Sequence, residues 1–140
     1  MSGEFIDTNI FIYLFDETDD RKRMIANQLI QQALETSSAC ISHQVLQETL
    51  NVVTRKLPSP MSAENAQRFL EQILIPLWQV MPSPALYQRS LALQSRYGFS
   101  FYDALIVAAA LESGCARLYT EDLQHGQKID GLLIENPFHV

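Results

Sequence analysis

The chain has 140 residues, of which 47% are hydrophobic and 19% charged, and a formal net charge of −6. This length and balance predict one globular domain over residues 1–140, and the acidity argues against non-specific binding to nucleic acid. No apolar run approaches the roughly 20 residues that span a bilayer, and Glu4 and Asp7 interrupt the N-terminus before any signal-peptide core, so we expect a cytoplasmic protein with no membrane partner.

Strand-like and helix-like segments alternate along the chain. Apolar residues recur at helical spacing in the longer segments and form short buried runs between them. In chain order the pattern predicts a strand at 4–7, helices at 8–15 and 21–36, a strand at 39–42, helices at 43–56 and 63–74, a strand at 77–81, helices at 84–97 and 101–113, and strands at 117–120 and 132–135.

Local signals mark where the helices begin and end. Ser42, Ser62, Ser83 and Ser100 stand at N-cap positions, and Pro84 follows one of them as a first-turn proline. Glycine or proline ends three helices, at Pro76, Gly98 and Gly114. Strands separated by helices predict an α/β fold, a three-layer α/β/α sandwich around a parallel sheet of four to five strands.

Four acidic residues fall at the edge of this sheet where sites form, beyond the carboxyl ends of the strands. Asp7 ends the first strand, and Glu48 lies early in the helix after the second. Asp103 occupies the first turn of the helix that Ser100 opens, and Asp122 follows the fourth strand by two residues. Acids from distant parts of the chain therefore converge on one edge.

Each acid also has a structural interpretation. Asp7 and Asp122 are suited to capping helical turns, Asp103 to partnering the Ser100 cap, and Glu48 to facing solvent. Glu48, however, has no basic residue at i+3 or i+4, and the helix around Asp103 is nearly free of charge. Glu121 is interpreted as a surface acid.

Clustered carboxylates require a compensating proton or cation. Two of them about 4 Å apart repel by roughly 4 kcal/mol at an effective dielectric near 20. Either some bind a proton, or a divalent ion neutralises them, and all-oxygen ligands select Mg²⁺ or Mn²⁺. Such an ion would activate water and stabilise a phosphodiester during hydrolysis.

Several segments resemble the PIN domain family, with toxins of the virulence-associated-protein C (VapC) type most similar in style. The segments are "FIDTNIFIY", "SHQVLQETLNVV", "SFYDALIVAAALESGCARLYTEDL" and "GLLIENPF", and together they span nearly the whole chain. The resemblance implies a Mg²⁺- or Mn²⁺-dependent ribonuclease. It assigns the four catalytic, metal-binding acids to Asp7, Glu48, Asp103 and Asp122, with support from Thr8, Asn9 and Thr120.

The resemblance further implies a homodimer, an RNA substrate and, for toxin members, a small antitoxin partner. Basic residues near helix ends are the nearest candidates for phosphate contacts: Arg21, Lys22, Arg23, Arg55 and Lys56. For the first three, the alternative is a solvated loop leading into a helix. Cys40 and Cys115 share no metal-type spacing and are expected as free thiols in a reducing compartment.

Two rival functions stay open from the sequence. A haloacid-dehalogenase-like phosphohydrolase also opens with a strand ending in aspartate, but it needs a second aspartate where Asn9 stands. A non-catalytic RNA- or protein-binding module would use the partly apolar helices at 21–36 and 63–74 as its contact faces.

Overall fold

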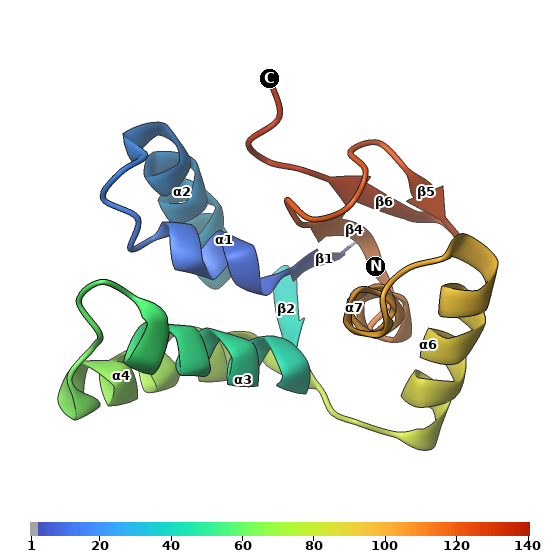
Figure 1. Cartoon of the computed structure of the whole chain (residues 1–140), viewed down its shortest axis with the longest axis horizontal. Helices are drawn as coiled ribbons and strands as arrows, with labels where there is room; N and C mark the ends of the chain where they lie inside the picture. Colours follow the sequence, from blue (N-terminus) through green and yellow to red (C-terminus); the bar gives the residue numbers. More distant parts are fainter. Residues whose placement is uncertain (1–2) are drawn as a thin grey trace.

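The computed structural model describes residues 3–140. It shows a mostly parallel sheet flanked by helices (Figure 1). The elements in chain order are β1 (Gly3–Ile6), α1 (Thr8–Tyr13), α2 (Asp20–Thr36), β2 (Ala39–Ser42), α3 (His43–Asn51), the π-helical turn η1 (Val52–Lys56), α4 (Ala63–Phe69), a second π-helical turn η2 (Leu70–Leu74), α5 (Ile75–Leu77), β3 (Trp78–Val80), α6 (Pro84–Tyr97), α7 (Phe101–Glu112), β4 (Cys115–Tyr119), β5 (Lys128–Ile129) and β6 (Leu132–Glu135). The predicted α/β class is confirmed.

The sheet has the strand order β3-β2-β1-β4-β6-β5. Four pairings are parallel, and β5 alone runs antiparallel, against β6. β1 lies between β2 and β4, so the carboxyl ends of these three strands share one edge. The chain leaves this edge after Ile6, Ser42 and Tyr119, close to three of the predicted acids.

All four predicted serine caps are present. Backbone N–H groups three residues on donate to the serine oxygens: Val45 to Ser42 at 3.3 Å, Asn65 to Ser62 at 3.1 Å, Leu86 to Ser83 at 3.1 Å and Asp103 to Ser100 at 3.2 Å. Each bond satisfies a donor that the first helical turn leaves free. These caps fix where α3, α4, α6 and α7 begin.

The core explains the nearly charge-free helix. Residues 104–110 of α7 are all buried, so this helix runs through the protein interior beside α6 and β4 (Figure 1). Phe5, Ile41 and Leu118 from the three central strands are fully buried as well. Within residues 3–140, every helix is too short or too polar to cross a bilayer.

Two expectations differ from the structure. The sheet has six strands instead of four or five, because the two-residue β5 pairs with β6 around a turn at Asp130 and Gly131, whose φ angles are 49° and 87°. Pro76 does not end a helix but lies inside α5. Proline fixes φ near the helical value and lacks only the N–H, so a short helical turn accommodates it.

Candidate active site

Asp7 is the buried centre of a cleft at the carboxyl ends of the strands. Asp7 directly follows β1 and caps α1, and only 5% of its surface is exposed. Its Oδ1 accepts the Thr8 N–H at 2.6 Å, and its Oδ2 accepts the Thr120 hydroxyl at 2.8 Å. The capping interpretation is therefore correct, and the same carboxyl group also faces the cleft.

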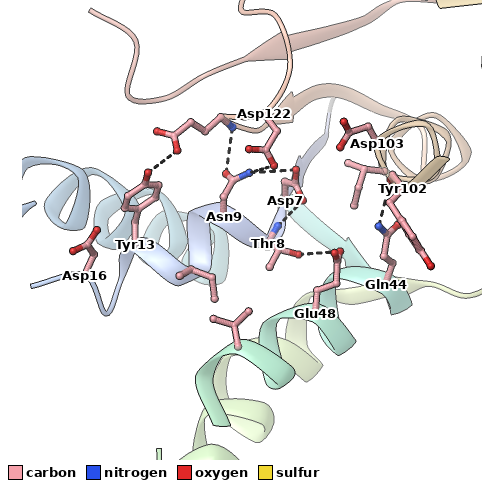
Figure 2. A pocket seen from close by; sticks show the side chains of 14 residues that line it. Asp7, Thr8, Asn9, Tyr13, Asp16, Gln44, Glu48, Tyr102, Asp103 and Asp122 are labelled. Atoms are coloured by element: carbon pink, nitrogen blue, oxygen red, sulfur yellow. Dashed lines mark hydrogen bonds between the residues drawn. The ribbon is translucent and has the colours of Figure 1, made fainter. Parts of the chain in front are cut away.

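The other three acids line the same cleft of about 460 Å³. Figure 2 shows Glu48 reaching it from α3, Asp103 from the first turn of α7, and Asp122 from the loop after β4. Residues 121–123 form bends, so Asp122 caps no helical turn. The four acids come from segments as far apart as residues 7 and 122, and the fold brings all of them to one cleft.

Burial and mutual repulsion act on the acids' protonation. Burial raises the pKa of Asp7 to about 7; hydrogen bonds from Thr120 and Thr8 oppose this rise, while Asp122 and Glu48 add to it. Burial likewise raises the pKa of Glu48, with a further contribution from the charges of Asp103 and Asp122. Proximity thus makes full ionisation of the cleft unfavourable.

Asn9 and Thr120 connect these acids by hydrogen bonds. The Asn9 amide nitrogen lies 3.1 Å from Asp122 Oδ2 and 3.4 Å from both Asp7 Oδ2 and Thr120 Oγ1. The fully buried Thr120 hydroxyl donates to Asp7 and accepts the Asp122 N–H at 3.1 Å. Thr8 donates to Glu48 Oε1 at 3.4 Å. All three predicted supporting residues therefore contact the acids.

Glu121 is not the surface acid that the sequence suggested. Its carboxylate binds Lys22 Nζ and accepts the Tyr13 hydroxyl, each at 2.5 Å, and its side chain is 26% exposed. Its N–H donates to Asn9 Oδ1 at 3.2 Å. The loop that carries Asp122 is thereby tied to α1 and α2. The side chain could not be placed from the sequence because its partners lie about a hundred residues away.

The candidate phosphate-binding residues lie outside the cleft. Its lining, within residues 3–140, includes no lysine or arginine. Lys22 pairs with Glu121, Arg23 with Asp20 at 2.7 Å, and Arg21 donates to the Phe138 carbonyl at 3.0 Å. The exposed Arg55 and Lys56 end η1. Sequence reasoning missed other lining residues, namely Tyr13, Asp16, Gln44 and Tyr102.

The cleft's acids do not form a closed metal-binding cluster by themselves. In the described part of the chain, no three His, Cys, Asp or Glu side chains are close enough together to hold an ion as they stand. The expectation of a shared cleft is met, while the expectation of a tight cluster is not. The donor set is nevertheless all oxygen, as hard divalent ions prefer.

We expect Thr120→Val to destabilise the protein by about 1–3 kcal/mol at alkaline pH, because a buried carboxylate loses its donor. The loss should shrink near pH 5, where Asp7, with its pKa near 7, is protonated. Urea unfolding at several pH values measures this. Thr120→Ser keeps the hydroxyl and is the matched control; equal pH dependence in both variants would contradict the assigned hydrogen bond.

The chain is an α/β protein with an acidic cleft at the carboxyl ends of its parallel strands. Comparison of its sequence with models of protein families identifies the family. The PIN domain model matches residues 5–129, so the chain belongs to the PIN domain family. A comparison with curated protein sequences gives no match.

Solved structures of toxin–antitoxin proteins share the fold. A toxin–antitoxin complex from Klebsiella pneumoniae has 25% identity and a TM-score of 0.68, covering 99% of this chain and 100% of that one. DNA-bound VapBC from Salmonella typhimurium has 21% identity and a TM-score of 0.68, covering 98% and 99%. VapC20 from Mycobacterium tuberculosis, a sarcin-ricin loop cleaving toxin, has 22% identity and a TM-score of 0.60, covering 86% and 90%.

Proposed function

We propose that this chain is a divalent-metal-dependent ribonuclease, the toxin of a toxin–antitoxin pair. The observation that carries the proposal is the convergence of Asp7, Glu48, Asp103 and Asp122, from four separate segments, on one cleft. Membership of the PIN domain family supports it. The structural similarity to a toxin–antitoxin complex and to a sarcin-ricin loop cleaving toxin supports the toxin role and the RNA substrate.

The all-oxygen donor set of the cleft fits a divalent cation in its chemistry, although the acids of residues 3–140 would have to move closer together to hold one. Asp7 is buried, its pKa is raised, and no lysine or arginine of the described residues lines the cleft to neutralise it. A buried carboxylate without a cation is costly, and oxygen donors on several sides suit Mg²⁺ or Mn²⁺. Asp7 and Asp103 would be the main ligands, and Glu48 and Asp122 would hold a second ion or bound waters.

A bound divalent ion would supply Lewis acidity and charge neutralisation for phosphodiester hydrolysis. The chain's own groups have distinct tasks. Thr8 and Thr120 hold both oxygens of Asp7 in place, and Asn9 fixes Asp122 beside it. The Asp7 carboxyl group carries a proton in part of the molecules near neutral pH, and that proton must leave before the carboxylate can act as a ligand.

Substrate and partners follow from the same proposal. RNA would approach an acidic cleft that repels its phosphates. Basic side chains outside the cleft would therefore have to bind the RNA backbone. Arg55 and Lys56 are exposed and carry this role most readily, while Arg21, Lys22 and Arg23 each already bond to another residue of the chain. We further propose a cytoplasmic, single-domain protein that forms a homodimer and binds a cognate antitoxin.

The two rivals are less well supported. A haloacid-dehalogenase-like phosphohydrolase needs an aspartate where Asn9 donates to its neighbours, and the PIN family match opposes it. A non-catalytic binding module requires no acidic cleft. It would bind RNA or protein but show neither metal affinity nor cleavage, which separates it experimentally.

Mn²⁺ affinity should rise steeply with pH. Because Asp7 must lose its proton, and its pKa is about 7, we expect affinity to increase about tenfold per unit up to neutrality and to level off above it. Isothermal titration calorimetry at several pH values, in buffers of different ionisation enthalpy, measures affinity and proton release together. Affinity that is independent of pH would contradict the role of Asp7.

Cleavage itself is tested with purified protein and a mixed pool of structured and single-stranded RNAs. We expect Mn²⁺ or Mg²⁺ to be required and excess EDTA to stop the reaction. Persistent cleavage in EDTA would contradict a metal-dependent nuclease. Absence of both Mn²⁺ binding and cleavage would favour the binding module.

A further inference from the structure

Glu121 is a further carboxylate that lines the acidic cleft, and it precedes Asp122 in the chain. Its Oε2 pairs with Lys22 Nζ at 2.5 Å. Its Oε1 accepts the Tyr13 hydroxyl at 2.5 Å, the bond that a dashed line marks at Tyr13 in Figure 2. Lys22 also donates to the Tyr13 hydroxyl, at 3.2 Å. Both oxygens of Glu121 are therefore bonded to residues of α1 and α2, and its charge is neutralised within the chain.

Several contacts fix where the Lys22 ammonium group lies. The backbone N–H of Lys22 donates to Asp19 Oδ1 at 3.0 Å, which sets the residue in the first turn of α2. Its Nζ atom lies 4.7 Å from the centre of the Tyr13 ring and 5.4 Å from that of Phe138, and these two rings meet edge to face 4.8 Å apart. A cation is attracted to the face of an aromatic ring. The rings and Glu121 therefore hold an ammonium group that would otherwise extend into solvent.

The loop after β4 links this ion pair to Asp122. Glu121 donates its N–H to Asn9 Oδ1 at 3.2 Å, and Asn9 Nδ2 in turn lies 3.1 Å from Asp122 Oδ2. The Asp122 N–H donates to Thr120 Oγ1 at 3.1 Å. Residues 121–123 form bends and Asp122 is exposed, so no helix or strand fixes this side chain. Its placement depends on these bonds and on the ion pair beside them.

The Lys22–Glu121 pair is the least exposed ion pair within residues 3–140. Both of its side chains are 26% exposed, whereas those of Arg68 and Glu64 are 63% and 75% exposed. Exposed ion pairs contribute little, because water and salt screen them and two long side chains lose freedom. A partly buried pair that shares a further hydrogen-bonding partner, the Tyr13 hydroxyl, holds its geometry better. The Arg68–Glu64 pair therefore provides a control.

We propose that the Lys22–Glu121 ion pair positions Asp122 in the cleft, and that Lys22 fixes this loop instead of binding the RNA backbone. The inference rests on the proposed nuclease function, in which Asp122 holds a second ion or bound waters. The pair fixes the loop after β4 to α2, so Asp122 is presented to the cleft at one place. Without Lys22, Glu121 would be an uncompensated carboxylate beside the other acids, and their repulsion would displace the loop.

Lys22→Met tests the proposal, because methionine keeps an unbranched apolar stem and loses the charge. We expect kcat for cleavage of a fluorescent RNA in Mn²⁺ to fall about 10-fold or more, as for other groups that orient metal ligands, with KM nearly unchanged. A lysine that binds RNA phosphates would give the opposite result: KM would rise, kcat would stay, and the salt dependence of KM would weaken. Arg68→Met breaks the exposed control pair and should leave both constants unchanged.

A double-mutant cycle joins the effect to Glu121. Glu121→Gln loses the charge but keeps an oxygen for the Tyr13 hydroxyl, and it should lower kcat as much as Lys22→Met does. Together the two substitutions should lower kcat no further than either alone, because both remove the same ion pair. Lys22→Arg keeps a positive charge and should recover part of the loss. Fully additive losses would mean independent roles and would overturn the proposal.

Amide exchange and metal binding report on the loop without cleavage. The N–H groups of Glu121 and Asp122 are hydrogen-bonded, and both should exchange with deuterium faster in Lys22→Met. The Asp7 N–H, bonded to the Tyr119 carbonyl at 3.0 Å, should exchange as in the native protein. NMR measures these rates residue by residue. Calorimetry should show Mn²⁺ affinity about 10-fold weaker in Lys22→Met and unchanged in the control variant.

The outcomes separate this inference from the nuclease proposal. If the native protein binds Mn²⁺ and cleaves RNA, and Lys22→Met matches it in kcat, metal affinity and amide exchange, the positioning role is wrong and the nuclease assignment stands. A raised KM with unchanged kcat would assign Lys22 to RNA and would also overturn the inference. If the native protein neither binds Mn²⁺ nor cleaves RNA, the nuclease assignment is wrong and the positioning role falls with it.

Discussion

Asp7→Asn and Asp103→Asn should each reduce Mn²⁺-dependent RNA cleavage by more than about 100-fold, since each removes a charged ligand from the proposed metal site. Both substitutions preserve side-chain size. In Asp7→Asn the new amide oxygen can still accept the Thr8 N–H. In Asp103→Asn the backbone N–H of residue 103 can still donate to Ser100 Oγ. Cleavage of a fluorescent RNA, with metal affinity measured in parallel, quantifies the loss.

Asp16→Asn is the matched control for these variants. Asp16 lines the same cleft, but its carboxylate accepts the N–H and hydroxyl of Thr18, at 2.9 Å and 2.5 Å. It should retain cleavage within a few-fold of the native protein. Circular dichroism should show all three variants folded. Equal cleavage by Asp7→Asn and the native protein, in a preparation free of contaminating nuclease, would contradict the proposed site.

The starts of four helices and the end of α6 were predictable because their causes are local. A serine side chain at an N-cap accepts a hydrogen bond from the N–H three residues later. The helix start is therefore encoded within one turn of sequence, as at Ser42, Ser62, Ser83 and Ser100. Gly98 ends α6 with a φ of 74°, a conformation that glycine adopts without strain. Neither signal depends on the rest of the fold.

The missed features are short or depend on distant partners. β5 has two residues, fewer than any periodicity can reveal, although Asp130 and Gly131 form the dipeptide typical of a tight hairpin. Glu121 looked solvated because the sequence cannot show that Tyr13 and Lys22 would meet it.

The site was predictable only in outline. Topology alone places Asp7, Glu48, Asp103 and Asp122 at one edge of a parallel sheet, and all four line one cleft. The hydrogen bonds that orient them were not predictable from topology. Asn9 and Thr120 entered the expectation through family resemblance, and their separation of 111 residues explains why no local pattern reveals their contact.

In EDTA, the native protein should lose stability relative to Asp7→Asn as pH rises from about 4 to about 8. The pKa of Asp7 is 3.8 for the free side chain and about 7 in the folded protein. A group whose pKa is higher in the folded state favours folding fully below its unfolded pKa, and that contribution disappears as pH passes the folded value. The difference of about three units corresponds to at most about 4 kcal/mol.

Urea unfolding of both proteins across this range isolates the effect, because every other titrating group is common to the two. The native protein should approach and then fall below the stability of Asp7→Asn as the buried carboxyl group ionises beside Asp122 and Glu48. Mn²⁺ added at pH 8 should restore stability to the native protein and much less to the variant, because an ion bound only by the folded state stabilises that state. Parallel stability curves in EDTA would mean that Asp7 ionises without cost, and the electrostatic reason for placing a cation beside it would no longer hold.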